Sequence, residues 1–197
     1  MATSDDNRER QSKVSSEGAE FERHVKEYLN RVFSSKGVPL YVMSEAEVLA
    51  DSRLKKKFSI PVHEKKEVWG DVDLLVIDSK TRSPLAVISC KLSLHGRFSE
   101  TLFYALVFKK MDPKTKVVFA TPDKGRQAND NWQSEWGTAS SPTRDRDFAE
   151  YFLDGVYIDN EYLKNKWGAS GRTSLSGKIK DISDLANDLM QWSKEVR

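Results

Sequence analysis

The chain has 197 residues, a length that predicts one domain. It contains 32 Lys and Arg against 30 Asp and Glu, a formal net charge of +2, which excludes a generic polycation that binds nucleic acid through bulk charge. Hydrophobic residues make up 38% of the chain, and no apolar run approaches the ~18 residues that span a bilayer, so we expect a soluble domain that does not enter a membrane. Cys90 is the single cysteine, which excludes an internal disulfide framework and a cysteine-rich zinc module and fits a reducing cytoplasm.

The N-terminal part of the chain changes character near residue 15. Residues 1–14 are charged and almost free of apolar side chains, so they are predicted to form a disordered or frayed arm. Residues 15–197 are predicted to form the single domain. Apolar residues at three- and four-residue spacing predict a first helix, and its stripe consists of Phe21, Val25, Tyr28, Leu29 and Val32.

The next segments alternate between strand and helix patterns. Tyr41 to Asp51 reads as a short strand followed by a helix, whose start carries a capping-box pattern of Ser44 and Glu47. The runs 68–77 (VWGDVDLLVI) and 85–90 (LAVISC) are rich in β-formers and are joined by a polar turn. They are therefore predicted to pair as antiparallel neighbours.

A helix-like stretch follows Lys91, and its apolar face is predicted to contain Leu94, Phe98, Leu102, Ala105 and Leu106. Further strands are predicted at 116–120 and 155–158, and a last helix at 182–192, with a long polar loop between the two strands. The expected fold class is α/β, with a central mixed β-sheet flanked by helices.

Two aspartates and a lysine stand at the ends of the two central β-runs. Asp71 and Asp73 are two residues apart and would point to one face of a strand. Lys91 ends the next strand, which places its ammonium group beside the carboxylates if the strands pair. Carboxylate oxygens bind Mg²⁺, and a cation beside a lysine supports hydrolysis of phosphodiester bonds by an activated water.

These elements resemble the PD-(D/E)xK nuclease superfamily, and specifically the type II restriction endonucleases. The resemblance rests on the strand GDVDLLVI, the strand AVISCK and the following segment LSLHGRFSE. The upstream GAEFERHV resembles the Gly-x-x-Phe-Glu start of a core-flanking helix in that superfamily, with Gly18, Phe21 and Glu22 at the matching positions. The resemblance implies a restriction endonuclease-like core and Mg²⁺ as cofactor, with Asp73 as the motif aspartate and Lys91 as the motif lysine.

One position departs from the motif. The acidic residue expected two before the lysine is Ser89, and a serine cannot supply a charged metal ligand. Some restriction enzymes, including those that cut around CCGG, take a glutamate from the following helix instead, and Glu100 is the candidate here. The resemblance therefore implies a metal set of Asp73, Asp71 and Glu100.

The corresponding catalytic set is Asp73, Lys91, Glu100 and Glu22. Whether Glu100 or Glu22 replaces the missing acid stays open, because either could be an ordinary surface residue of its helix. Cys90 is expected to be a small core residue.

Basic residues gather locally although the total is balanced. The segment 124–146 is rich in side chains that read base edges and is predicted to be a base-reading loop, although a solvated surface loop is the alternative. The segment 162–180 is predicted to contact the phosphate backbone. The expected DNA-binding residues are Ser89, Ser93, His95, Arg97, Lys124, Arg126, Gln127, Asn129, Arg144, Arg146, Lys164, Lys166, Arg172 and Lys178.

Together these patterns favour a Mg²⁺-dependent, sequence-specific endonuclease of double-stranded DNA in a prokaryotic cytoplasm. A homodimer is expected, because cutting both strands of a symmetric site needs two active sites. Two alternatives remain: a structure-selective repair nuclease or junction resolvase of the same fold, and a catalytically inactive DNA-binding module, which Ser89 would favour.

Overall fold

The computed structural model describes residues 4–63, 66–94, 97–128, 131–167 and 173–195. The helices are α1 (Ser4–Ser35), α2 (Glu45–Ala50), α3 (Ser52–Phe58), α4 (Phe98–Met111), α5 (Arg144–Phe152), α6 (Asn160–Trp167) and α7 (Ile182–Glu195). The strands are β1 (Leu40–Ser44), β2 (Ser59–His63), β3 (Lys66–Trp69), β4 (Leu74–Asp78), β5 (Pro84–Cys90), β6 (Lys116–Thr121), β7 (Arg126–Ala128), β8 (Asn131–Gln133), β9 (Gly155–Ile158) and β10 (Ile179–Asp181).

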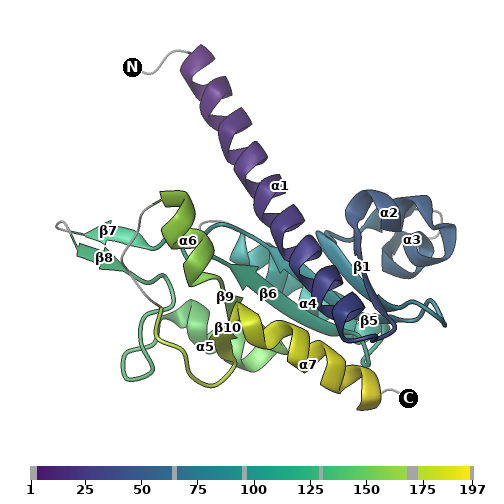
Figure 1. Ribbon diagram of the computed structural model, residues 1–197. Helices are drawn as coiled ribbons and strands as arrows, with labels where there is room; N and C mark the ends of the chain where they lie inside the picture. The colour runs from purple at the N-terminus through teal and green to yellow at the C-terminus, as the bar shows by residue number, and fades with distance from the viewer. Residues whose placement is uncertain (1–3, 64–65, 95–96, 129–130, 168–172, 196–197) are drawn as a thin grey trace.

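In the described part of the chain, a six-stranded sheet has the order β1-β4-β5-β6-β9-β10. The β1–β4 and β4–β5 pairs are antiparallel, whereas β5–β6, β6–β9 and β9–β10 are parallel. The predicted mixed sheet and the predicted β4–β5 hairpin are therefore confirmed. The pairs β2–β3 and β7–β8 form separate two-stranded ribbons outside the main sheet (Figure 1).

The sheet is covered by helices on both faces. Along β4, Leu74 and Val76 join the apolar cluster under α1 and α7, while Leu75 and Ile77 join the cluster under α4 and α5. This alternation follows from the two-residue period of a strand, and fully buried strands read as continuous apolar runs. Figure 1 shows α1 and α7 crossing the front of the sheet, with α4 behind it.

The run 68–77 is not one strand but two elements that belong to different sheets. β3 ends at Trp69, and the main-sheet strand β4 begins only at Leu74. The break occurs at Gly70, whose N–H donates to the carbonyl oxygen of Phe58 at 3.1 Å. A Cβ at this position would lie 2.6 Å from the Phe108 ring and 2.9 Å from that carbonyl oxygen. Gly70 therefore permits the chain to pass close to the end of α3 and to α4. This path leads directly into the segment that carries Asp71 and Asp73.

We expect Gly70→Ala to destabilise the protein by about 1–3 kcal/mol, because the added methyl group overpacks against ring and backbone atoms. Urea unfolding followed by circular dichroism measures this change in the free energy of unfolding. Gly18→Ala is the matched control, since a Cβ at Gly18 meets nothing within 4 Å. Equal midpoints for the two variants would contradict the assigned role of Gly70.

Three segments differ from their predictions. The first helix extends back to Ser4, through the residues predicted to form an arm; Arg, Glu, Gln and Lys are good helix formers. α4 begins at Phe98, so the buried Leu94 lies ahead of the helix rather than on its apolar face. Leu106 is exposed, because it lies on the side of α4 that faces away from the sheet. The polar loop contains the β7–β8 hairpin. In the described ranges, no helix is long and apolar enough to cross a membrane.

Candidate active site

One edge of the sheet collects the predicted active-site residues. β5 and β6 are parallel, so their carboxyl ends meet at this edge, and the antiparallel β4 begins there. Asp71 and Asp73 lie in the segment that leads into β4, and Lys91 directly follows β5. The Lys91 N–H donates to the carbonyl oxygen of Ala120 in β6, which extends the strand pairing to the lysine itself.

The three side chains form one charge cluster. The Lys91 Nζ atom lies 2.9 Å from Asp73 Oδ2 and 3.4 Å from Asp71 Oδ2. Asp73 Oδ2 also accepts from the Cys90 N–H at 2.7 Å and from the Ser89 hydroxyl at 3.3 Å. The Lys91 and Asp73 side chains are 11% and 15% exposed, while Asp71 is 38% exposed. Asp71 is thus the member of the cluster most open to solvent.

Burial and charge set the protonation of this pair. Burial raises the pKa of Asp73, and the Lys91 ammonium group opposes that rise. Burial alone would lower the pKa of Lys91, but the carboxylates of Asp73 and Asp71 outweigh it, and the pKa lies above its ordinary value. Lys91 therefore stays protonated at neutral pH, so it can orient an anion or a water but cannot accept a proton from one.

Glu22 approaches the same cluster from α1. Burial raises its pKa to about 7, and the negative charge of Asp73 adds to the rise while Lys91 opposes it. Burial is the main cause of this rise, and the neighbouring carboxylates add to it. A cation bound beside these carboxylates would favour the ionised form of Glu22.

The pKa of Glu22 predicts a pH-dependent stability difference. Because the folded-state pKa of about 7 lies above the unfolded value, the native state loses stability as the pH rises from the unfolded pKa to about 7, and the loss is complete above that pH. Glu22→Gln is thus expected to be more stable than wild type by about 1–2 kcal/mol at pH 8.5, after allowance for partial solvent exposure, and equal to it near pH 4.

Chemical denaturation across this pH range in metal-free buffer measures the difference. Glu27→Gln, an exposed position on the same helix, should show no such pH dependence. A constant difference between Glu22→Gln and wild type would contradict the raised pKa.

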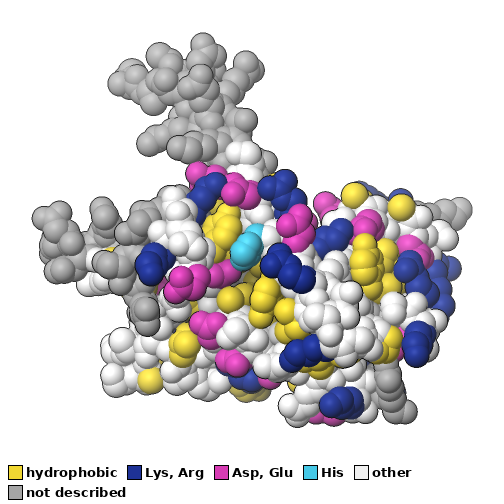
Figure 2. Space-filling view, viewed as in Figure 1, with side chains coloured by type: hydrophobic (Ala, Val, Ile, Leu, Met, Phe, Trp, Pro, Cys, Tyr) yellow, Lys and Arg dark blue, Asp and Glu magenta, His cyan; other side chains and the backbone are white. Residues whose placement is uncertain are grey.

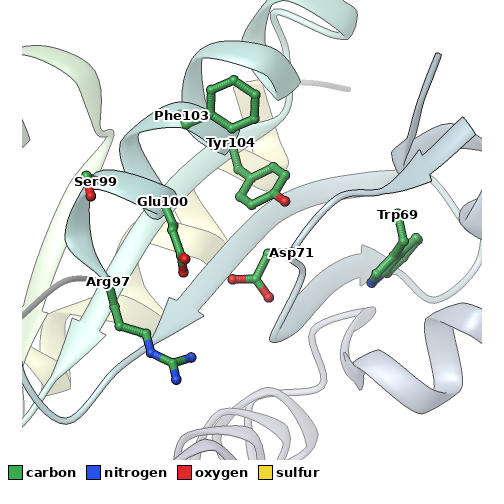
Figure 3. Close-up of a pocket in the computed structure, with 7 residues that line it drawn as sticks. All are labelled: Trp69, Asp71, Arg97, Ser99, Glu100, Phe103 and Tyr104. Atoms are coloured by element: carbon green, nitrogen blue, oxygen red, sulfur yellow. The ribbon is translucent and has the colours of Figure 1, made fainter. Parts of the chain in front are cut away.

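Glu100 approaches from α4, on the other face of the sheet. It lines an open pocket of about 510 Å³ with Trp69, Asp71, Arg97, Ser99, Phe103 and Tyr104. In Figure 3 the carboxylates of Glu100 and Asp71 point toward one another across this pocket, and Arg97 extends below them. The two glutamates that could replace the missing motif acid thus flank the aspartates from opposite faces.

The donor set fits a hard divalent cation. No group of three or more His, Cys, Asp or Glu side chains among the described residues is close enough to hold a metal ion alone. Mg²⁺, however, binds through one or two carboxylates and keeps several waters. Asp71 and Asp73 supply such carboxylates, and Glu22 and Glu100 lie on either side of them.

Two residues predicted to contact DNA are instead buried in the protein. Ser89 is 6% exposed, and its hydroxyl group lies 2.9 Å from that of Thr101 on α4, so it links Asp73 to the helix. Arg146 is 3% exposed and donates to the Ser174 carbonyl oxygen and the Ser176 hydroxyl. In this structure both side chains are thus engaged within the protein.

Several predicted lysines are engaged within the protein. Lys124 pairs with Glu17 at 3.0 Å and Lys166 with Glu20 at 2.6 Å. Lys178 donates to the carbonyl oxygen of Leu153. In Figure 2 acidic and basic side chains are interspersed on the face formed by α1, α6 and α7. Among the described residues of 162–180, Lys166 and Lys178 therefore already have partners within the protein.

The remaining predicted DNA-binding residues fall into two groups. Arg97, Arg144 and Lys164 are exposed and Ser93 is half-buried, so these four remain accessible. Outside the residues or side chains that the structure describes lie His95, Arg126, Gln127, Asn129 and Arg172.

Two buried acids near the site escaped the sequence reasoning. Asp123 and Glu135 are 0% and 2% exposed, and both accept hydrogen bonds at the base of the β7–β8 hairpin. Their positions in a polar stretch gave no sign of burial. The one available signal was the pattern Ser-Glu-Trp at 134–136, in which a large apolar residue follows the acid.

Comparison with known proteins agrees with this arrangement. A family model described as BsaWI restriction endonuclease type 2 matches residues 51–188, which is more than half of the chain. The fold is similar to the crystal structure of the specific restriction endonuclease AgeI–DNA complex, with a TM-score of 0.65 and 18% identity over 93% of this chain and 69% of that chain. No curated protein matches significantly. The restriction endonuclease-like core expected from the motifs is confirmed, and the chain belongs to the BsaWI family of type 2 restriction endonucleases.

Proposed function

We propose that this protein cleaves double-stranded DNA at a specific sequence in a Mg²⁺-dependent reaction. Membership of a restriction endonuclease family supports a DNA-cleaving hydrolase. The observation that carries the proposal further is the contact of Lys91 with both Asp73 and Asp71, at 2.9 and 3.4 Å, on the edge where β4 begins and β5 ends.

The residues divide the chemistry between them. Mg²⁺ held by Asp71 and Asp73 would neutralise phosphate charge and make a bound water more acidic. Lys91, which stays protonated, contacts the scissile phosphate and orients the water. Glu100 and Glu22 flank the pair and can each accept hydrogen bonds from water. Arg97 lines the same pocket as Glu100 and is placed to bind a phosphate oxygen.

The test is digestion of a DNA of known sequence with purified protein and Mg²⁺, followed by mapping of the fragment ends. Discrete fragments with one common end sequence are expected, and EDTA should abolish them. Cleavage of a four-way junction in preference to linear duplex would instead favour a structure-selective nuclease. Tight, specific DNA binding that never leads to cleavage with any divalent cation would favour an inactive binding module.

We further propose that the active form is a homodimer paired through α4 and α5. These helices run side by side in the same direction. At their starts, Thr143 donates to the carbonyl oxygen of Trp136, whose ring packs on Phe98 at 5.3 Å. At their ends, the Lys109 Nζ atom donates to the carbonyl oxygen of Phe152 at 2.8 Å.

The outer surface of this helix pair suits a second copy of the chain. Asp145 and Asp147 occupy the first turn of α5, and Lys109 and Lys110 the last turn of α4. A two-fold axis across the pair would therefore set acid against base and align the helix dipoles antiparallel. Between these charges, exposed apolar side chains supply area to bury, namely Leu106, Phe148 and Tyr151.

We expect the double variant Leu106→Glu, Tyr151→Glu to remain monomeric by light scattering in the presence of specific DNA, under conditions where wild type dimerises. It should nick a supercoiled plasmid rather than linearise it, because single active sites then act separately. Val62→Glu, an exposed apolar position on β2, is the control. A double variant that dimerises and linearises plasmid like wild type would overturn the assigned surface.

A further inference from the structure

Both ends of the β7–β8 hairpin are fastened to the short segment that follows Lys91. The Lys124 N–H, just ahead of the hairpin, donates to the carbonyl oxygen of Leu92 at 3.3 Å. Glu135, just after it, accepts from the Leu94 N–H at 2.9 Å through Oε2. The two anchoring points thus lie one and three residues beyond Lys91. Displacement of the hairpin base would act on the strand end that carries the lysine.

A buried acid holds Glu135 in place. Asp123 Oδ1 accepts from the Glu135 N–H at 3.1 Å. Asp123 Oδ2 accepts from the hydroxyl groups of Ser134 and Thr173, at 2.6 and 2.5 Å. Because buried carboxylates are costly unless they are hydrogen-bonded, these contacts specify one geometry for the hairpin base.

Aromatic packing makes the same base rigid. The Trp132 Nε1 atom donates to the carbonyl oxygen of Lys124 at 3.0 Å, which ties the second strand of the hairpin to a residue two positions before the first strand. Trp136 is fully buried and packs on Phe98 of α4 and Phe119 of β6. The hairpin base is therefore continuous with the sheet and with the helix that carries Glu100.

We propose that Glu135 is a positioning residue that couples contact of the hairpin with DNA to the placement of Lys91. The inference rests on the proposed function, in which the hairpin belongs to the base-reading segment. Figure 1 shows the β7–β8 hairpin projecting from the body of the molecule. Contact of the hairpin with the correct DNA sequence would fix the position of residues 92–94, and with it the position of Lys91. Contact with a different DNA sequence would not.

The experiment compares three substitutions of Glu135. Gln keeps an oxygen that can accept from the Leu94 N–H, Asp keeps the charge but is too short to reach it, and Ala removes the acceptor. Single-turnover cleavage of the preferred site is measured with Mg²⁺. The dissociation constants of wild type and of each variant for the same DNA are measured in buffer that contains Ca²⁺ instead of Mg²⁺.

We expect Glu135→Asp and Glu135→Ala to lower the cleavage rate by about 10–100-fold, the cost of one unsatisfied buried donor, while the dissociation constant changes less than about threefold. The preference for the correct site over a singly substituted site should shrink in parallel. Glu135→Gln should stay within about threefold of wild type in both measurements. Glu27→Ala, at an exposed position on α1, is the control.

Hydrogen exchange supplies a readout that does not depend on cleavage. Specific DNA should protect the amides of residues 92–94 in wild type and in Glu135→Gln, but not in Glu135→Asp. Failure of Gln to rescue, or equal losses in rate and affinity, would overturn the coupling while the proposed function stands. A wild-type protein that neither binds nor cleaves DNA would instead overturn the proposed function, and the coupling with it.

Discussion

Lys91→Ala is expected to lower the single-turnover rate of DNA cleavage by about 10²–10³-fold or more, because it removes a cation that contacts both aspartates of the site. The ammonium group is held protonated by those carboxylates, so its loss removes a positive charge from the place where the phosphate develops negative charge. Cleavage of a DNA that contains the mapped site, followed by gel analysis, measures the rate.

The same substitution has a second expected effect, on stability. With Lys91 gone, Asp73 is left buried and uncompensated beside Asp71, which costs about 3 kcal/mol or more. A divalent cation should restore part of this loss, so Mg²⁺ should raise the melting temperature of Lys91→Ala more than that of wild type. Lys80→Ala, in the turn at the opposite end of β4, is the control. Full activity in Lys91→Ala would exclude the lysine from the reaction.

Asp73→Asn is expected to abolish measurable cleavage while DNA binding is retained or becomes tighter. The amide oxygen can still accept the hydrogen bond from the Cys90 N–H, so the local fold should survive. The charge that attracts a cation is lost, and so is the charge that balances Lys91 at 2.9 Å. Removing a negative charge near the phosphate path also lowers repulsion toward DNA.

Two measurements separate these effects. Cleavage assays across a Mg²⁺ titration should show a loss of about 10³-fold that high metal concentration does not repair. Gel-shift affinity in Ca²⁺ should equal that of wild type or exceed it. Asp112→Asn, which removes a surface ion pair with Lys57, serves as the control. Equal loss of binding and cleavage in Asp73→Asn would indicate misfolding rather than loss of a metal ligand.

The central strands and the pair Asp73 and Lys91 could be predicted from the sequence because their signals are local. Apolar runs of the right length mark buried strands, and a polar turn between two of them marks a hairpin. Once these strands pair, the residues at the start of one and the end of the next must meet. The departure at Ser89 was also visible in the sequence, although its contact with Thr101 was not.

Burial of charged side chains could not be predicted, because residue type does not specify it. Arg146 and Arg144 stand two residues apart in one polar stretch, yet the first is buried and donates to a backbone turn while the second is exposed. Asp123 and Glu135 lie in a polar part of the sequence, yet both are buried and accept hydrogen bonds. Whether these side chains are buried depends on which distant segments pack together, and a short stretch of sequence does not carry that information.

The sequence by itself determined the α/β class, the order of the central elements and the two residues most central to the proposed chemistry, since strand period and strand pairing follow from local patterns. Only the tertiary structure decided that Glu22 and Glu100 reach the aspartates from opposite faces of the sheet. It also decided that the hairpin after β6 is anchored to the segment after Lys91. These relations join helices and loops that are far apart in the chain, and the packing of α1 and α4 on the two faces of the sheet brings them together.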